Sequence, residues 1–407
     1  MHRHFHFHAA MVFSAMGLAI GTMSAVTLTQ PSRAATPLPF FSVSAVDSPQ
    51  AAIILDSQPD VHVAHFTFRG GREDMTIHTL TLHNCVATPK DSDGDCIDGT
   101  EALGSDLVAP LVTLTATSSN GNTQVVTGVF VDGSLTFSDL SLLVAHSLTA
   151  TVDVNISTAA IDDTAVTSGM QFQVAINART KEFSATLFSG RVITQTDVNK
   201  NYAANGMTLR NTKPTLTLST LSPMGYVEPS FLEVLRVDAT AEAAGDITFN
   251  SVVFSLTTTD NAGTVWNTCK TLGADTSNFK LVNTLTNTEV PATWVAYRAN
   301  GNACTPNRDD VAFLSATLTT AETIPAGTTT PYALHVQTVR ASALQSDSMS
   351  AALPSETELS ALGMDVNALV WSDGTSGGTE IDGTIIEILP VIGNTLIFHK
   401  SSTNDQS

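Results

Sequence analysis

The sequence predicts an all-β protein made of two antiparallel β-sandwiches in tandem. Segments such as LTATVDV at 148–154 alternate strictly between apolar and polar residues, which is the period of a half-buried antiparallel strand. These segments recur at roughly 10–20-residue intervals and are separated by turn-rich clusters such as SSNGN. The chain is rich in Thr and Val and only 14% charged, a composition that favours strands over helices. One short helix is expected, at 355–363, where a helical period occurs.

An internal repeat predicts that there are two sandwiches. Four segments of the first half recur in the same order in the second half, sharing their alternation more than their identity. The aligned pairs are 43–49 with 218–223, 64–68 with 235–239, 75–82 with 247–254, and 148–154 with 332–338. We therefore expect domains at 35–209 and 210–407, with a boundary near Pro214 and little linker between them.

Residues 1–34 are predicted to be a signal peptide. A short basic start, MHRHFHFH, precedes an apolar run at 9–26, and SRA at 32–34 offers the small residues that a signal peptidase recognises. Cleavage is expected after Ala34 or Ala35, which would leave the signal segment as the chain's sole contact with a membrane. An uncleaved anchor is the alternative, because the run is long enough to cross a thin membrane.

The four cysteines of an exported chain are predicted to form two disulfides. Local pairing would join Cys85 to Cys96 and Cys269 to Cys304, one bridge in each half, although other connectivities remain open. Free thiols with a redox or catalytic role are the alternative, and such a role is not expected.

An acidic loop in the first half is the one candidate metal site. Five carboxylates lie between Asp91 and Glu101 and would repel one another without a cation. Alternating aspartates followed by a backbone carbonyl are the oxygen ligands of a calcium loop. The predicted calcium ligands are Asp91, Asp93, Asp95, Ile97, Asp98 and Glu101. The alternative is a solvated acidic loop, and no second site is expected because the insertion at 269–304 lacks the acidic triplet.

The stretch DSDGDCIDGTEALGSD resembles the aspartate-rich calcium repeats of thrombospondin type 3 and related bacterial surface proteins over about sixteen residues. It departs from that pattern in two places. Cys96 stands where a glycine usually makes the sharp turn, and Ala102 stands at the twelfth position, with Glu101 one residue early. A disulfide to Cys85 could fix the turn instead.

HExxH, a P-loop and GxGxxG after a strand are all absent from the sequence. His65 and His78 align with Arg236 and Asn250 of the second repeat and are expected on the outward face of strands. Trp294 and Trp371 are flanked by apolar residues and are predicted to lie in a core rather than on a sugar-binding platform.

The formal charge of −20 repels phosphate backbones and argues against a nucleic-acid partner. The strand pattern together with DITFNSVVF, IPAGTTTPYALHV and ALVWSDGTSGG resembles secreted, Thr-rich bacterial cell-surface proteins with immunoglobulin-like domains. That resemblance implies a non-catalytic surface-layer, filament or adhesin component, found on the cell surface or outside the cell, whose partners are other copies, other surface proteins or surface glycans. A secreted carbohydrate-binding protein is the main alternative, and a secreted hydrolase is the third.

Overall fold

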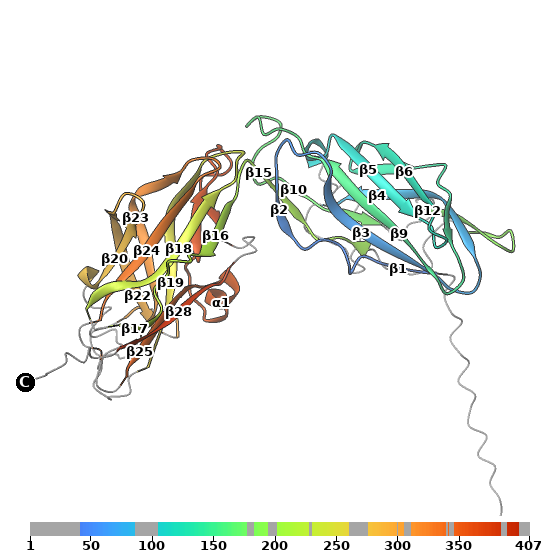
Figure 1. Ribbon diagram of the computed structural model, residues 1–407. Coiled ribbons are helices and arrows are strands. Elements are labelled where there is room, and N and C mark those ends of the chain that lie inside the picture. The colour runs from blue at the N-terminus through green and yellow to red at the C-terminus, as the bar shows by residue number, and fades with distance from the viewer. Residues whose placement is uncertain are drawn as a thin grey trace, which may run out of the picture. The chain divides into compact units, whose positions relative to one another are not determined.

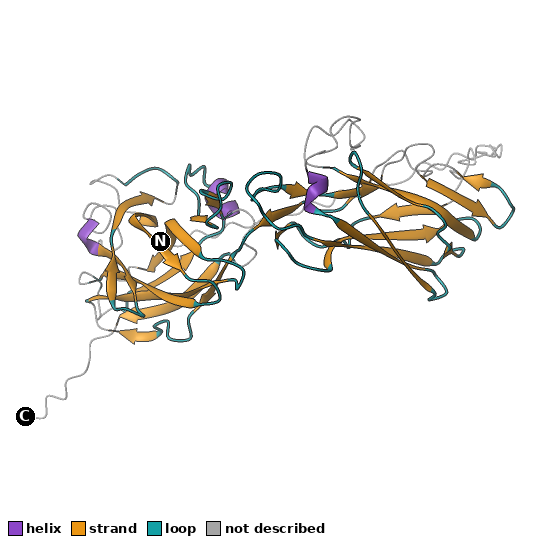
Figure 2. Cartoon of the chain, turned by 90° about the horizontal axis from the view of Figure 1, so that it is seen from above, coloured by secondary structure: helices purple, strands orange, loops and turns teal. Residues whose placement is uncertain are grey.

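The structure is a computed structural model, and it describes most of the chain between residues 41 and 398. The described ranges are 41–85, 105–176, 183–193, 202–227, 230–259, 276–298, 300–304, 311–338, 341, 346–383 and 389–398. Strands dominate them, with one short α-helix, α1 (Glu356–Ala361), and two 3₁₀ turns, η1 (Ser105–Val108) and η3 (Thr276–Asn278), as Figure 2 shows. The all-β prediction is confirmed. The predicted signal peptide, 1–34, lies outside the described residues.

A five-stranded antiparallel sheet forms one layer of the N-terminal half, residues 41–210, with the strand order β1-β3-β9-β5-β6 (Figure 1). Its strands are β1 (Phe41–Ser44), β3 (Val61–Gly70), β9 (Thr149–Ser157), β5 (Leu111–Thr117) and β6 (Thr123–Gly128). The predicted strand at 148–154 is β9, in which Ala150, Val152 and Val154 are buried while the alternate residues are not.

The C-terminal half, residues 214–398, has a five-stranded sheet with the corresponding order, β16-β18-β24-β20-β21. Its strands are β16 (Pro214–Leu218), β18 (Phe231–Ala241), β24 (Thr329–Gln337), β20 (Phe279–Asn283) and β21 (Thr288–Val290). Phe66 pairs with Val152 in the first sheet and the equivalent Val237 pairs with Tyr332 in the second. The alignment of 148–154 with 332–338 is therefore wrong by four residues. Four is an even number, so the buried face was still assigned correctly.

A β-bulge occurs at the same place in both of these sheets. The register shifts between His62 and Ala64 in β3, and between Glu233 and Leu235 in β18. Beside each bulge a buried serine hydroxyl accepts a backbone amide: Ser48 from His65 at 3.0 Å, and Ser222 from Arg236 at 3.1 Å. The two halves thus share strand order, bulge and a polar contact, which is strong physical support for the internal repeat.

The second layer of each half is a larger sheet centred on one long strand. In the N-terminal half β4 (Met75–Asn84) pairs with four strands, and in the C-terminal half β19 (Ile247–Thr259) pairs with three. The other N-terminal strands of this sheet are β13 (Val192–Ile193), β12 (Phe183–Leu187), β11 (Val174–Ile176), β14 (Tyr202–Ala203), β7 (Ser134–Phe137) and β8 (Leu142–Val144). The other C-terminal strands are β17 (Gly225–Val227), β28 (Val391–Phe398), β25 (Ser348–Leu353), β23 (Val311–Ile324), β22 (Ala292–Arg298), β26 (Leu369–Ser372) and β27 (Ile381–Asp382).

Two pairs among the described strands are parallel, which the expectation of purely antiparallel sheets missed. They are β15 (Met207–Arg210) with β2 (Ala52–Leu55), and β17 with β28. The first belongs to a small sheet that also contains β10 (Gln171–Phe172). Parallel pairs need a long crossover connection, so alternation within a short segment cannot reveal them.

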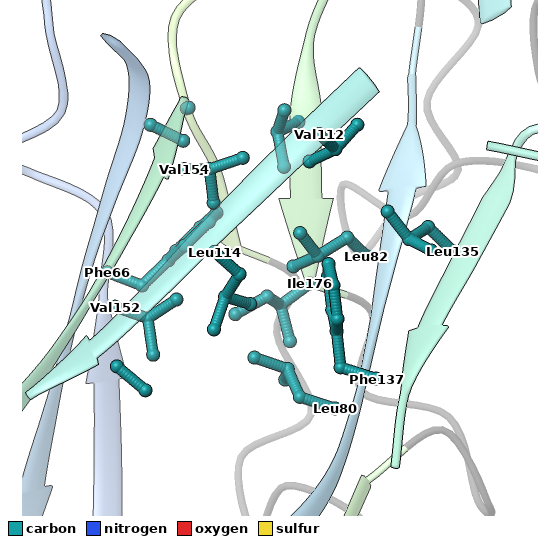
Figure 3. Packing of buried hydrophobic residues seen from close by; sticks show 14 of the residues in the cluster. Phe66, Leu80, Leu82, Val112, Leu114, Leu135, Phe137, Val152, Val154 and Ile176 are labelled. Carbon is teal, nitrogen blue, oxygen red and sulfur yellow. The ribbon is translucent and has the colours of Figure 1, made fainter. Parts of the chain in front are cut away.

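Each half buries its own apolar core between its sheets. In Figure 3, Phe66, Val152 and Leu114 from the five-stranded sheet face Leu80 and Ile176 from the sheet centred on β4. The buried residues of the second core come from the C-terminal half except for Ile53 of β2, and Leu55 of the same strand packs against them. Burial of this apolar surface is the main force that holds such layers together.

The predicted helix is α1, within 355–363. Ser355 is its N-cap and its hydroxyl accepts from the amide of Glu358 at 3.2 Å. Leu359 is buried and anchors the helix against the apolar cluster around Phe313.

Candidate functional site

The predicted calcium ligands, from Asp91 to Glu101, lie outside the described residues, as do Cys96, Cys269 and Trp266. Calcium binding therefore stays a prediction. Cys85 and Cys304 are each disulfide-bonded. Because their predicted partners are not described, the pairing of the four cysteines stays a prediction too.

The two ends of the acidic segment are held close together. Asn84, the last residue of β4, donates from its side-chain amide to Asp106 Oδ1 at 2.9 Å, and Asp106 Oδ2 accepts from the amide of Gly133 at 2.8 Å. Asn84 is fully buried. These bonds hold the end of β4 beside η1, and the acidic segment runs between these two elements.

Trp294 and Trp371 lie in the core, as predicted. Trp371 is fully buried and Trp294 is 8% exposed. The indole of Trp294 packs against Phe254 and Phe279, with ring centroids 6.3 Å and 5.7 Å away. Neither side chain is available to stack on a sugar. These two tryptophans therefore give no support to a carbohydrate-binding function.

The histidines of the N-terminal half have different surroundings. His78 is exposed and bonds to Thr186 at 3.0 Å, and His65 is partly exposed, so both face outward as predicted. His83, by contrast, is buried. Residues 80–84 at the end of β4 are all buried, so both faces of the strand are covered there.

The bulge in β3 brings two histidines to one outer face. Residues three apart in a regular strand point to opposite faces, but the extra residue at the bulge puts His62 and His65 on the same side. Asp153 of β9 pairs directly with His65. Its Oδ1 lies 2.6 Å from His65 Nδ1 and 3.3 Å from His62 Nε2. An interpretation based on strict alternation could not place these three side chains together.

The equivalent bulge in β18 produces an ion pair. Glu233 and Arg236 occupy the positions of His62 and His65, and Arg236 donates two hydrogen bonds to the Glu233 carboxylate, at 2.9 Å and 2.6 Å. These bonds raise the pKa of the Arg236 guanidinium. Ala333 stands where the first sheet has Asp153. The same β-bulge therefore brings together two histidines and an aspartate in the N-terminal half, and a Glu–Arg ion pair in the C-terminal half.

A buried polar cluster joins the two halves, and we call it the junction: Ser168, Arg210, Asn211 and Asp373. The Asp373 carboxylate is 1% exposed. It accepts from the Ser168 hydroxyl at 2.5 Å and from the Asn211 amide at 3.2 Å. Thr375 donates both its amide and its hydroxyl to the other oxygen. A buried carboxylate with this many donors is well satisfied, and breaking the cluster would be costly.

Arg210 supplies the positive charge of the junction. Its guanidinium donates to the Ser168 hydroxyl at 3.1 Å. Burial lowers the pKa of Arg210, and Asp373 and Asp382 oppose that effect. An arginine keeps its charge under such a shift, so the junction holds a permanent cation beside a buried carboxylate.

Two glycines leave room for close contacts at the junction, Gly377 against the N-terminal half and Gly378 beside Asp373 within the C-terminal half. A Cβ on Gly377 would lie 2.6 Å from the carbonyl oxygen of Ser168, and one on Gly378 would overlap the Asp373 carboxylate. The stretch WSDGTSGG therefore has a structural role at the contact.

None of the helices within the described ranges has the length and apolar character of a membrane span.

No protein-family model matches the chain, and a search of curated proteins found no relative. Structural similarities are distant. The CupB6 tip adhesin from Pseudomonas aeruginosa aligns at 7% identity over 89% of this chain and 98% of that one, with a TM-score of 0.17. A putative membrane-anchored protein from Corynebacterium diphtheriae aligns at 8% identity over 88% and 92%, with a TM-score of 0.18. Red sea bream transglutaminase aligns at 9% identity over 90% and 32%, with a TM-score of 0.23. These scores are too low to support a conclusion about function.

Proposed function

We propose that this chain is an exported, non-catalytic structural or adhesive component of the cell surface, of the surface-layer, filament or adhesin type. The observation that carries the proposal is the repetition of one sheet plan, β1-β3-β9-β5-β6 and β16-β18-β24-β20-β21, joined by buried hydrogen bonds at the junction. A tandem of similar modules without a free linker suits load-bearing or display outside the cell. We assign both halves to the immunoglobulin-like class, because each packs two mainly antiparallel sheets face to face.

Export would make the two disulfides and the calcium loop stabilising elements of this component. In the chain-entropy model, a bridge between Cys85 and Cys96 contributes about 3 kcal/mol and one between Cys269 and Cys304 about 4 kcal/mol. A cation bound by the acidic loop would remove the repulsion among its carboxylates. Its partners, on this proposal, are copies of itself, other surface proteins or surface glycans.

The test combines localisation with calcium-dependent stability. Intact cells treated with protease should lose the protein while cytoplasmic markers persist. Purified protein should unfold at a higher temperature with calcium than with chelator, Asp93→Ala should abolish the difference, and light scattering should show larger particles with calcium. Retention in the cytoplasm would overturn the proposal. A substrate turnover that is lost on replacing specific carboxylates, with the fold intact, would contradict the non-catalytic assignment.

A further inference from the structure

The outer face of the N-terminal five-stranded sheet carries a set of donors that the C-terminal sheet lacks. His62, His65 and Asp153, which we call the histidine cluster, each offer a ligand atom, and these atoms all lie within 4.8 Å of one another. The side chains are 43%, 22% and 34% exposed, so an ion could reach them from solvent. The cluster depends on the bulge in β3, which is a fixed feature of the backbone.

We propose that the histidine cluster binds a divalent transition-metal ion of the zinc class. Two imidazole nitrogens and one carboxylate oxygen are the donor set of zinc sites that keep a position open for water or another ligand. This site is distinct from the acidic loop, because calcium prefers an all-oxygen shell whereas imidazole suits zinc, copper and nickel.

The distances suit a tetrahedral ion after a small adjustment. Ligand atoms bonded at about 2.0–2.1 Å around a tetrahedral centre lie ~3.3 Å apart. His62 Nε2 and Asp153 Oδ1 are already 3.3 Å apart. His65 Nδ1 and Asp153 Oδ1, at 2.6 Å, form a hydrogen bond that the metal would replace, so this pair must open. Rotation of these partly exposed side chains would open the pair.

Neighbouring polar groups would support bound metal. Thr67 Oγ1 lies 3.4 Å from His65 Nε2, the ring nitrogen that would remain free when Nδ1 binds the ion. A partner on the second ring nitrogen fixes the orientation of a metal-bound imidazole. The carbonyl of Ala64 lies 3.0 Å from His62 Nε2 and competes for that nitrogen in the metal-free protein.

The C-terminal sheet provides an internal comparison. At the equivalent bulge, Glu233 and Arg236 neutralise each other, and Ala333 replaces Asp153. A permanent cation at the position of His65 excludes a metal ion there. Of the two equivalent bulges, only the one in the N-terminal sheet therefore provides side chains that can bind a metal ion.

The experiment is a zinc titration of the full chain by calorimetry. His2, His4, His6 and His8 are replaced by Asn in every protein used, since they would bind zinc themselves, and excess calcium occupies the acidic loop. We expect one zinc ion per chain. His62→Asn and Asp153→Asn should each weaken binding by ~100-fold or more, because even the loss of an outer-shell partner typically costs 10–100-fold. His335→Asn, in the C-terminal sheet, is the matched control and should bind as the parent does.

Cobalt supplies a second readout that does not depend on stability. Co²⁺ bound by this cluster should give visible absorption bands of a tetrahedral centre in the parent and in His335→Asn, and these bands should be absent from His62→Asn. Circular dichroism verifies that each variant is folded. Absence of stoichiometric zinc binding, or zinc affinity unchanged in both cluster variants, would overturn the proposal and leave the cluster as a hydrogen-bonded triad.

Discussion

Thr158 and Thr338 occupy equivalent positions in the two halves and make the same contacts. Each threonine donates its backbone amide to a carbonyl of the segment that precedes the bulged strand, Gln58 in one half and Ser230 in the other, at 2.8 Å in both. Each hydroxyl accepts the amide of that same residue, at 2.8 Å and 3.0 Å. Both side chains are buried. The two halves therefore share a buried polar contact as well as a pattern of strands.

Replacing the hydroxyl of Thr158 should destabilise the protein. Thr158→Val keeps the shape but takes the acceptor from the Gln58 amide and the donor from the Leu55 carbonyl, which are bonded at 2.8 Å and 2.7 Å. Leaving a buried polar group unsatisfied costs about 1–3 kcal/mol. Urea unfolding measures this loss. Thr151→Val, on the outer face of β9, which ends just before Thr158, is the control and should change the unfolding free energy by less than about 0.5 kcal/mol. Equal effects of the two substitutions would contradict the assigned role.

The junction should be weakened by a single methyl group. Gly377→Ala places a Cβ 2.6 Å from the backbone oxygen of Ser168, and neither backbone can yield cheaply. We expect a destabilisation of about 1–3 kcal/mol, typical of overpacking, and faster proteolytic cleavage between residues 209 and 214. Gly206→Ala is the control, because a Cβ at that residue would have no atom within 4 Å. Cleavage of the two variants at the same rate would show that the contact does not hold the halves together.

Asp162 should contribute stability that is lost in acid. Its carboxylate accepts from the amides of Val166, Thr164 and Ala165, and these bonds lower its pKa from 3.8 to about 2. A lowered pKa in the folded state means that the contribution is complete above pH 3.8 and disappears as the pH falls towards about 2. Asp162→Asn should therefore be less stable than the parent at pH 5, and the difference should vanish near pH 2. Urea unfolding between these pH values provides the test, and a difference independent of pH would contradict it.

Alternation of apolar and polar residues predicted the all-β class and the buried face of β9, because burial on one side of a sheet imposes a period of two. The helical period at 355–363 predicted the short helix α1. It could not predict the histidine cluster, since a bulge shifts the period by one residue and nothing local in VHVAHF marks it. The junction could not be predicted from the sequence for a different reason. Ser168 and Asp373 are 205 residues apart, and only the folded chain brings them into contact.

His335 should make the C-terminal sheet less stable in mild acid. It lies between Glu233 and Lys280 in neighbouring strands, with the Phe231 ring 6.1 Å away. Burial lowers its pKa below 6.5; Glu233 opposes this, while Arg236 and Lys280 add to it. The unfolded chain then binds a proton more readily than the folded one, so stability falls as the pH drops from 6.5 through the folded-state pKa. His335→Gln should remove this part of the pH dependence, whereas His78→Gln, at an exposed site, should retain it. Parallel pH profiles for the parent and His335→Gln between pH 7 and 5 would show that burial of this ring carries no energetic penalty for its charged form.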